Sequence, residues 1–176
     1  MRASVFIATS LDGFIARPDG TLDWLPESPE PHGFEEFYAS VDALVIGRHT
    51  YEVVLGFGSW AYGTKPVIVL SSTMTELKAP AGAVCSLMCG TPREIVERLE
   101  QRGLEHLYID GGVTIQRFLD AGLIQRLIIT RIPVLLGSGI PLFGKASRDI
   151  RLEHVTTRTY PSGLVQSEYQ VAPARR

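Results

Sequence analysis

Short apolar runs and segments of helical periodicity alternate along most of the chain. Each apolar run is bounded by glycine, serine, proline or charged residues and is short enough to form a buried strand. These strand candidates are residues 5–8, 43–46, 66–70 and 107–109. Between them, apolar side chains recur three or four positions apart, as they do on one face of a helix. The helix candidates are residues 33–40, 48–55, 92–102 and 111–122.

The last third of the chain consists mostly of strand patterns. A long apolar segment covers residues 127–136, and two alternating segments, 151–160 and 164–171, flank a Pro-Ser-Gly turn that predicts a hairpin. Strands that alternate with helices predict an α/β fold whose sheet is largely parallel and covered on both faces. The hairpin adds antiparallel strands at one edge of that sheet.

Length and charge narrow the class of protein. The chain has 176 residues, which suits one domain over residues 1–176, and its formal net charge of -2 gives no support for binding nucleic acid or an anionic membrane. Any anion-binding site must therefore be formed by a few neighbouring groups, such as backbone amides with an arginine or serine. No apolar stretch is long enough to cross a membrane, and the N-terminus has no signal-peptide pattern, so we expect a cytoplasmic protein. Cys85 and Cys89 are too few for a zinc ribbon, and no metal site is expected.

Glycine and hydroxyl residues replace apolar ones where three predicted strands end. The segments are residues 47–50, 71–73 and 110–114. Glycine lets the backbone approach a ligand closely, and the free amides at a helix N-terminus attract phosphate. Each segment taken alone could be an ordinary turn or cap. Together they predict a phosphate-bearing ligand at one sheet edge, because the carboxyl ends of parallel strands meet there.

Standard nucleotide-binding and deaminase motifs are absent. Gly137-Ser138-Gly139 begins like a dinucleotide fingerprint, but Leu142 stands at the position of the third glycine. The P-loop pattern does not occur, nor does the zinc-deaminase pattern of H-x-E with P-C-x-x-C. The ligand site therefore has to be recognised by other motifs.

Three segments resemble the successive cofactor motifs of dihydrofolate reductases, in the same order and with similar spacing. They are residues 46–52, 65–72 and 109–112. Residues 8–16 and 131–143 are more similar to a sister family, the reductase domain of the bifunctional riboflavin-biosynthesis deaminase/reductase (its C-terminal domain) and its stand-alone relatives. The resemblance extends from about Arg2 to Tyr169 and implies a three-layer dihydrofolate reductase-like fold.

The resemblance implies an NADPH cofactor and assigns residues to its parts. Gly47, Arg48 and Thr50 would meet the phosphates, and Ser71 and Ser72 would lie near the 2′-phosphate. The pyrophosphate would be held by Gly111, Gly112, Val113 and Thr114. Ile7 and Ala8 would hold the nicotinamide amide through backbone groups.

The residue that handles the proton is harder to assign. The helix carboxylate of folate reductases would fall at Pro31, which cannot serve. Asp12, in the riboflavin-type Ser-x-Asp-Gly pattern, is the first catalytic candidate and could instead be a turn residue. Asp23, in the loop that would cover the nicotinamide, is the second and could be an exposed loop acid. His32, His106 and His154 share no metal-ligand spacing and are interpreted as structural or exposed.

The leading functional hypothesis is an NADPH-dependent reductase that transfers hydride to a C=N-type bond of a small pyrimidine- or pteridine-like substrate. It would resemble 5-amino-6-(5-phosphoribosylamino)uracil reductase of riboflavin biosynthesis. The alternatives are a dihydrofolate reductase and a catalytically inactive nucleotide-binding module. The resemblance also implies a homodimer, in which the strand over residues 127–136 is either an interface element or simply central.

Overall fold

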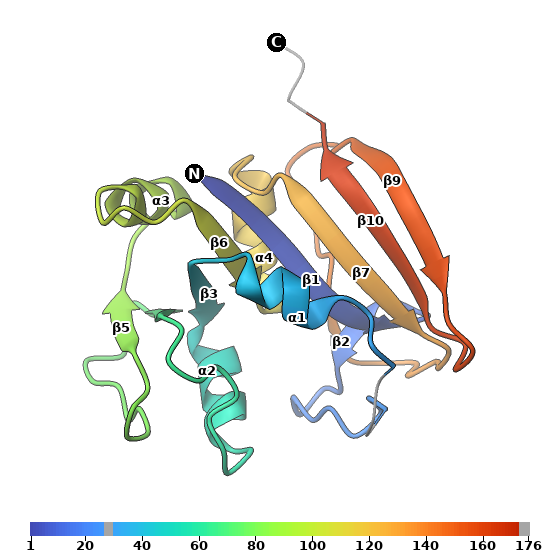
Figure 1. Cartoon of the computed structure of the whole chain (residues 1–176), viewed down its shortest axis with the longest axis horizontal. Coiled ribbons are helices and arrows are strands. Elements are labelled where there is room, and N and C mark those ends of the chain that lie inside the picture. Colours follow the sequence, from blue (N-terminus) through green and yellow to red (C-terminus); the bar gives the residue numbers. More distant parts are fainter. Residues whose placement is uncertain (27–29, 173–176) are drawn as a thin grey trace.

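An eight-stranded sheet forms the centre of the molecule (Figure 1). The structure is a computed structural model and describes residues 1–26 and 30–172. The strands of this sheet are β1 (Arg2–Ser10), β3 (Ala43–Gly47), β4 (Val67–Leu70), β5 (Cys85–Met88), β6 (His106–Asp110), β7 (Arg126–Ile132), β9 (Leu152–Thr159) and β10 (Val165–Val171). The helices are α1 (Phe34–Ala39), α2 (Arg48–Leu55), α3 (Pro92–Glu100) and α4 (Gly112–Asp120).

The sheet has the strand order β5-β4-β3-β6-β1-β7-β10-β9. All neighbours from β5 to β7 pair in parallel, whereas β10 pairs antiparallel with both β7 and β9. The predicted α/β class, the mostly parallel sheet and the antiparallel C-terminal hairpin are therefore confirmed. The parallel part brings the carboxyl ends of β1, β3, β4 and β6 to one edge.

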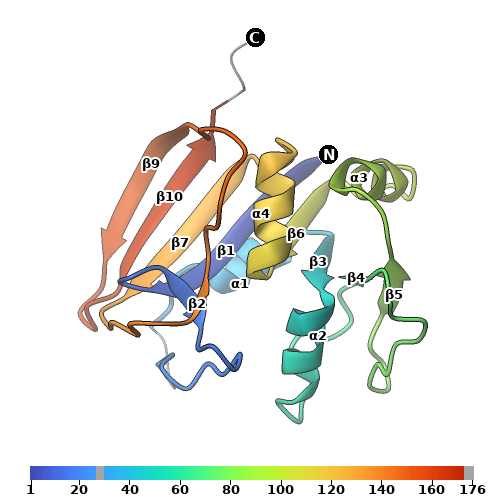
Figure 2. The ribbon, with the colours of Figure 1, turned by 180° about the vertical axis from the view of Figure 1, so that it is seen from behind.

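Helices cover both faces of the parallel part and so create three layers. Helix α1 lies over one face, where Phe37 packs with Phe6, Leu44 and Tyr108 (Figure 1). Helices α3 and α4 cover the opposite face, where Leu99 and Phe118 share a cluster with apolar side chains of the strands (Figure 2). The strands carry near-continuous apolar runs because each is buried on two sides.

Strand β7 is shorter than the sequence indicates and lies in the interior of the sheet. The predicted strand 127–136 ends at Ile132, because Pro133 has no amide hydrogen for the ladder and the amide of Val134 turns back to the Ile132 carbonyl at 2.8 Å. Both edges of β7 are occupied, by β1 and β10. Of the two interpretations of this segment, the central strand is confirmed, and it offers no free edge to a partner.

A second, two-stranded sheet lies beside the main one and does not follow from the sequence pattern. It joins β2 (Phe14–Ala16) to β8 (Ile140–Pro141) in antiparallel pairing. The two strands are too short to show periodicity. This pairing holds the segment that follows β1 against the segment that follows β7, at the edge where the parallel strands end.

Among the described residues, no helix is long and apolar enough to cross a membrane. Within the same residues, no three histidine, cysteine, aspartate or glutamate side chains come together in a way that could hold a metal ion.

Helix α3 begins with a capping box, in which Thr91 and Glu94 cap each other. The Thr91 hydroxyl accepts a hydrogen bond from the amide of Glu94 at 3.3 Å, and the Glu94 carboxylate accepts one from the amide of Thr91 at 2.8 Å. We predict that Thr91→Ala lowers the free energy of unfolding by about 1 kcal/mol, because helix amides lose their cap. Urea denaturation measures this change. Thr91→Ser keeps the hydroxyl and should stay near wild type; equal loss in both variants would contradict the capping role.

Candidate functional site

A cavity of about 230 Å³ opens at the edge where β1, β3 and β6 end. We call it the strand-end cavity. Its lining combines the end of β1 (Ile7 and Ala8), the start of α2 (Gly47, His49 and Thr50), the segment 110–114 at the start of α4, and residues Gly20, Leu22 and Leu25 of a loop. Most of this surface comes from strand ends and helix starts, as the sequence predicts for a ligand site.

Helices α2 and α4 begin close together. At the start of each helix, a glycine faces a threonine of the other helix. A Cβ atom at Gly47 would lie 3.0 Å from the Thr114 hydroxyl of α4, and one at Gly111 would collide with the Thr50 hydroxyl of α2. Gly111 also has a φ of 90°, in the region that favours glycine. The close approach of the two N-termini therefore depends on glycine at position 111, and it leaves little room for a larger residue at position 47.

The first-turn amides of both helices are available to a ligand. Neither Gly47, the N-cap of α2, nor Gly111, the N-cap of α4, provides a side chain to cap them. Amides in the first turn of a helix have no acceptor within the helix, and the helix dipole adds positive potential there. Two such helix starts facing one cavity form a site suited to an anion such as phosphate.

Eight of the eleven residues predicted for the cofactor line the strand-end cavity. They are Ile7, Ala8, Gly47, Thr50, Gly111, Gly112, Val113 and Thr114. Val113 is 70% exposed, which is unusual for an apolar side chain and fits a position at the mouth of a ligand site.

Arg48, Ser71 and Ser72 lie beside the cavity rather than in its lining. The Arg48 guanidinium donates to the Glu52 carboxylate at 2.7 Å and to the Thr73 hydroxyl at 3.3 Å. The Ser71 hydroxyl accepts from the amides of Thr73 and Met74, which fixes the turn after β4. Arg48 is thus held next to this turn, where the family resemblance implies the 2′-phosphate.

The loop over residues 17–25 covers one side of the strand-end cavity. The side chain of His49 lies against Gly20, where a Cβ atom would be 3.0 Å from the imidazole Nε2. Asp23 does not line the cavity; its carboxylate accepts a hydrogen bond from Arg17 at 2.6 Å, and this bond lowers the pKa of Asp23. The ion pair ties together the two ends of the covering loop.

Asp12 joins two turns at the same edge of the sheet. Its carboxylate accepts hydrogen bonds from the Ser10 hydroxyl at 2.6 Å, the Gly137 amide at 2.8 Å and the Leu136 amide at 3.2 Å. The Ser10 bond, with help from the two amides, holds the pKa of Asp12 below its usual value. Asp12 is exposed and orders the turn that follows β7.

A second cavity of about 200 Å³ shares Ile7, Ala8 and Leu25 with the first. We call it the aromatic cavity, since Phe6, His32 and Phe34 form one wall. The Phe6 ring lies 5.5 Å from His32 and 5.4 Å from Phe34, measured between ring centroids. The remaining lining residues are Pro26, Thr130, Ile132 and Leu164. Such a mostly apolar space suits a flat heterocycle.

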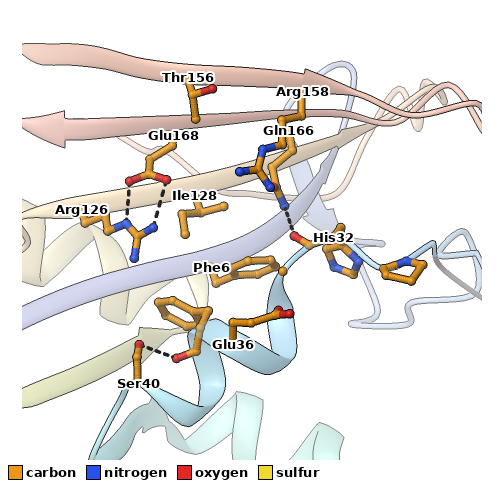
Figure 3. Close-up of a pocket in the computed structure, with 13 residues that line it drawn as sticks. Phe6, His32, Glu36, Ser40, Arg126, Ile128, Thr156, Arg158, Gln166 and Glu168 are labelled. Atoms are coloured by element: carbon orange, nitrogen blue, oxygen red, sulfur yellow. Dashed lines mark hydrogen bonds and ion pairs between the residues drawn. The ribbon is translucent and has the colours of Figure 1, made fainter.

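A third hollow, of about 560 Å³, lies between α1 and strands β7, β10 and β9 (Figure 3). We call it the sheet cleft; it shares Phe6 and His32 with the aromatic cavity. Arg126 and Glu168 form a bidentate ion pair across its floor, at 2.7 and 2.9 Å. The sheet cleft is therefore more polar than the aromatic cavity.

Comparisons with known proteins agree with this geometry. The family model described as "RibD C-terminal domain" matches residues 4–166. The chain belongs to this family. The family resemblance proposed from the sequence motifs is thereby confirmed.

Two relatives are similar over nearly their whole length. The "Uncharacterized protein YwjB" of Bacillus subtilis (strain 168) is 31% identical over 174 residues, which cover 89% of this chain and 90% of that protein. A crystal structure of a "Putative riboflavin biosynthesis protein" from Shewanella sp. PV-4 is 43% identical and superposes with a TM-score of 0.91, covering 98% of this chain and 100% of that chain.

The fold also occurs in a dihydrofolate reductase. The enzyme from Enterococcus faecalis, solved in complex with NADP(H) and a second ligand, superposes with a TM-score of 0.65 at 19% identity, covering 98% of this chain and 97% of that chain. This likeness confirms the dihydrofolate reductase-like fold. Family and fold together support a reductase-like function of the riboflavin-pathway type.

Asp110 lines the strand-end cavity. The sequence includes it in the strand-end segment 110–114 but assigns it no role with the cofactor. Burial raises the pKa of Asp110 to about 6, and a 2.8 Å hydrogen bond from the Gly111 amide offsets part of this rise. Burial, together with the charge of Asp110, also raises the pKa of Tyr108. The sequence places Asp110 at a strand end but carries no signal for its burial, which depends on packing around β6.

We predict that Asp110→Asn stabilises the protein near neutral pH. The unfolded carboxyl ionises near its ordinary pKa of 3.8 and the folded one near 6, so wild-type stability falls as pH rises through this interval. The rise in the pKa of Asp110 corresponds to a loss of at most ~3 kcal/mol in the free energy of unfolding of the wild-type protein. Asparagine removes the charge, and its carbonyl can keep the hydrogen bond from the Gly111 amide.

Urea denaturation across pH measures this effect. The gain of Asp110→Asn should shrink as pH falls through the interval and vanish below about pH 4. The exposed Asp149, changed to asparagine, serves as the control and should show no such pH-dependent gain. A gain for Asp110→Asn that is independent of pH, or a loss near neutral pH, would contradict the assignment.

Proposed function

We propose that the protein is an NADPH-dependent reductase that acts on a C=N-type bond of a small pyrimidine- or pteridine-like substrate. The observation that carries the proposal is the strand-end cavity, with two uncapped helix N-termini that approach each other closely at Gly47 and Gly111. Family membership supports the reductase class. The neighbouring aromatic cavity supports a flat heterocyclic substrate.

The residues of the strand-end cavity fit a dinucleotide. The first-turn amides of α4, from Gly112 to Thr114, suit the pyrophosphate, and the backbone of Ile7 and Ala8 suits the nicotinamide amide. Bound NADPH would supply the hydride, and the protein would supply position and exclusion of water. Because Ile7 and Ala8 line both cavities, a nicotinamide held there would lie beside a substrate in the aromatic cavity.

Arg48 carries the expected preference for NADPH over NADH. Its guanidinium is held beside the turn of Ser71 and Ser72 through Thr73, and arginine binds phosphate through several donors. Glu52 competes for the same guanidinium through the exposed ion pair. A 2′-phosphate would replace Glu52 as the partner of Arg48.

The two carboxylates predicted from the sequence have positioning roles in this proposal. Asp12 would hold the turn after β7 at the mouth of the site, and Asp23 would hold the covering loop through Arg17. Participation of either one in proton transfer stays a prediction. The homodimer and the cytoplasmic location also stay predictions.

Titration with NADPH and NADH tests the proposal directly. We predict that the wild-type protein binds NADPH more tightly than NADH, and that Arg48→Ala weakens NADPH about tenfold or more while NADH changes little, because a charge-assisted phosphate contact is lost. Binding is measured by calorimetry or by the fluorescence of the reduced nicotinamide.

Glu52→Gln is the matched control, since it keeps Arg48 and removes its competitor. NADPH binding should be unchanged or tighter in this variant. Equal weakening of both cofactors by Arg48→Ala would place Arg48 elsewhere on the cofactor. Absence of NADPH binding to the wild-type protein would refute the proposed function.

A further inference from the structure

One glutamine holds both polar residues of the aromatic cavity. The Gln166 amide group donates to the Thr130 hydroxyl and to the backbone carbonyl of His32, both at 3.0 Å; Figure 3 shows the second bond. Thr130 and Gln166 are buried. Of the described residues that line the aromatic cavity, His32 is the one with a titratable side chain. The cavity therefore has one group that can exchange a proton at a fixed position.

The hydrogen bonds of His32 determine which ring nitrogen can react. Nδ1 lies 2.7 Å from the carbonyl oxygen of Glu30. A carbonyl oxygen can only accept, so Nδ1 carries a hydrogen in every protonation state that keeps this bond. Nε2 has no hydrogen-bond partner within residues 1–26 and 30–172. Nε2 is thus the nitrogen that gains and loses the proton.

The C-terminal hairpin fixes the backbone on either side of the ring. The Glu30 carboxylate accepts hydrogen bonds from the hydroxyl and the amide of Ser162, which lies in the turn between β9 and β10. Gln166 of β10 holds the His32 carbonyl, and the Phe6 ring of β1 packs against the imidazole. The imidazole itself is held by the Glu30 carbonyl and packs on Phe6, so it loses little further entropy when it meets a ligand.

Other acids near the site are placed less well for this task. Asp12 and Asp23 line neither cavity, and both are acceptors in hydrogen bonds that favour their ionised forms. Asp110 lines the strand-end cavity, on the side proposed for the cofactor. An ionised carboxylate has no proton to donate.

We propose that His32 is the proton donor of the reduction, acting from Nε2 on the nitrogen of the substrate's C=N bond. The substrate carbon takes a hydride from the reduced nicotinamide, which becomes NADP⁺, and the C=N π bond opens. The substrate nitrogen takes the Nε2 proton, so a C–H and an N–H bond form. The neutral imidazole regains its proton from water. This inference rests on the proposed function, which supplies the NADPH.

The test follows NADPH oxidation in single turnover, so that product release does not mask the chemical step. The substrates are 5-amino-6-(5-phosphoribosylamino)uracil, its form without the phosphate, and dihydrofolate. We expect His32→Gln to slow hydride transfer about 100-fold or more, as general acid catalysis contributes 10²–10⁴-fold. NADPH affinity should stay unchanged, because His32 does not line the strand-end cavity. His154→Gln is the matched control, since His154 lies exposed on β9.

Chemical rescue and pH separate acid catalysis from a structural role. Added imidazole should restore part of the rate of His32→Ala, and no rescue is expected if the side chain only packs. The pH dependence of the rate should differ between the wild-type protein and His32→Ala, because the variant lacks the proposed proton donor. Glu36, Arg158 and the Glu30 carboxylate face the same region, and Asp110, whose pKa is raised to about 6, lies in the adjoining strand-end cavity. Any pH dependence that persists in the variant is attributed to these groups.

The possible results distinguish a failure of the role of His32 from a failure of the proposed reductase activity. The role of His32 is overturned if His32→Gln leaves the wild-type rate unchanged, or if imidazole does not rescue His32→Ala. Either result would leave the reductase proposal intact. If the wild-type protein binds NADPH but reduces none of the three substrates, the proposed C=N reductase activity is overturned, and the role of His32 with it.

Discussion

The close approach of two helix N-termini is the constraint on which the site depends. Helices α2 and α4 begin directly after the neighbouring strands β3 and β6, so both starts fall at the same sheet edge. Gly47 leaves room for the Thr114 hydroxyl, and Gly111 leaves room for the Thr50 hydroxyl. A side chain at Gly111 would collide with the Thr50 hydroxyl and strain the backbone, and one at Gly47 would press on the Thr114 hydroxyl. Both glycines therefore favour the close approach of the two sets of free amides. The phosphate site that we propose at this edge would therefore rely on backbone packing more than on charged side chains, which agrees with the net charge of -2.

The substrate side of the site depends on the antiparallel hairpin. Gln166 of β10 and Ser162 of the hairpin turn hold the segment from Glu30 to His32 against Phe6. The parallel part of the sheet thus builds the proposed cofactor side, and the hairpin completes the proposed substrate side. Strand β1 belongs to both, because Ile7 and Ala8 form the wall that the two cavities share.

Local sequence signals predict the parallel half of the fold well. Helix α2 spans the predicted residues 48–55, and the start of α3 follows from Thr91, Pro92 and Glu94, because caps and apolar periodicity act over a few residues. The strand ends that bear glycine also converge as predicted. By contrast, β2 and β8 are too short to leave a pattern, and β7 stops early because of a single proline.

The features missed at the site depend on contacts between distant residues. His32 is separated by 134 positions from Gln166, which holds its carbonyl, and nothing in its immediate sequence marks it as a site residue. The raised pKa of Asp110 likewise depends on packing around β6. Asp12 and Asp23 have sequence patterns typical of a site, but their carboxylates make hydrogen bonds outside both cavities.

The central claim is that the strand-end cavity binds NADPH beside a separate substrate cavity. A crystal structure of the protein with NADPH tests it most directly. We expect the pyrophosphate to lie against the first-turn amides of α4, the 2′-phosphate near Arg48 and the nicotinamide beside Ala8, with the aromatic cavity left open. NADPH bound in the sheet cleft, or with its nicotinamide away from β1, would contradict the account.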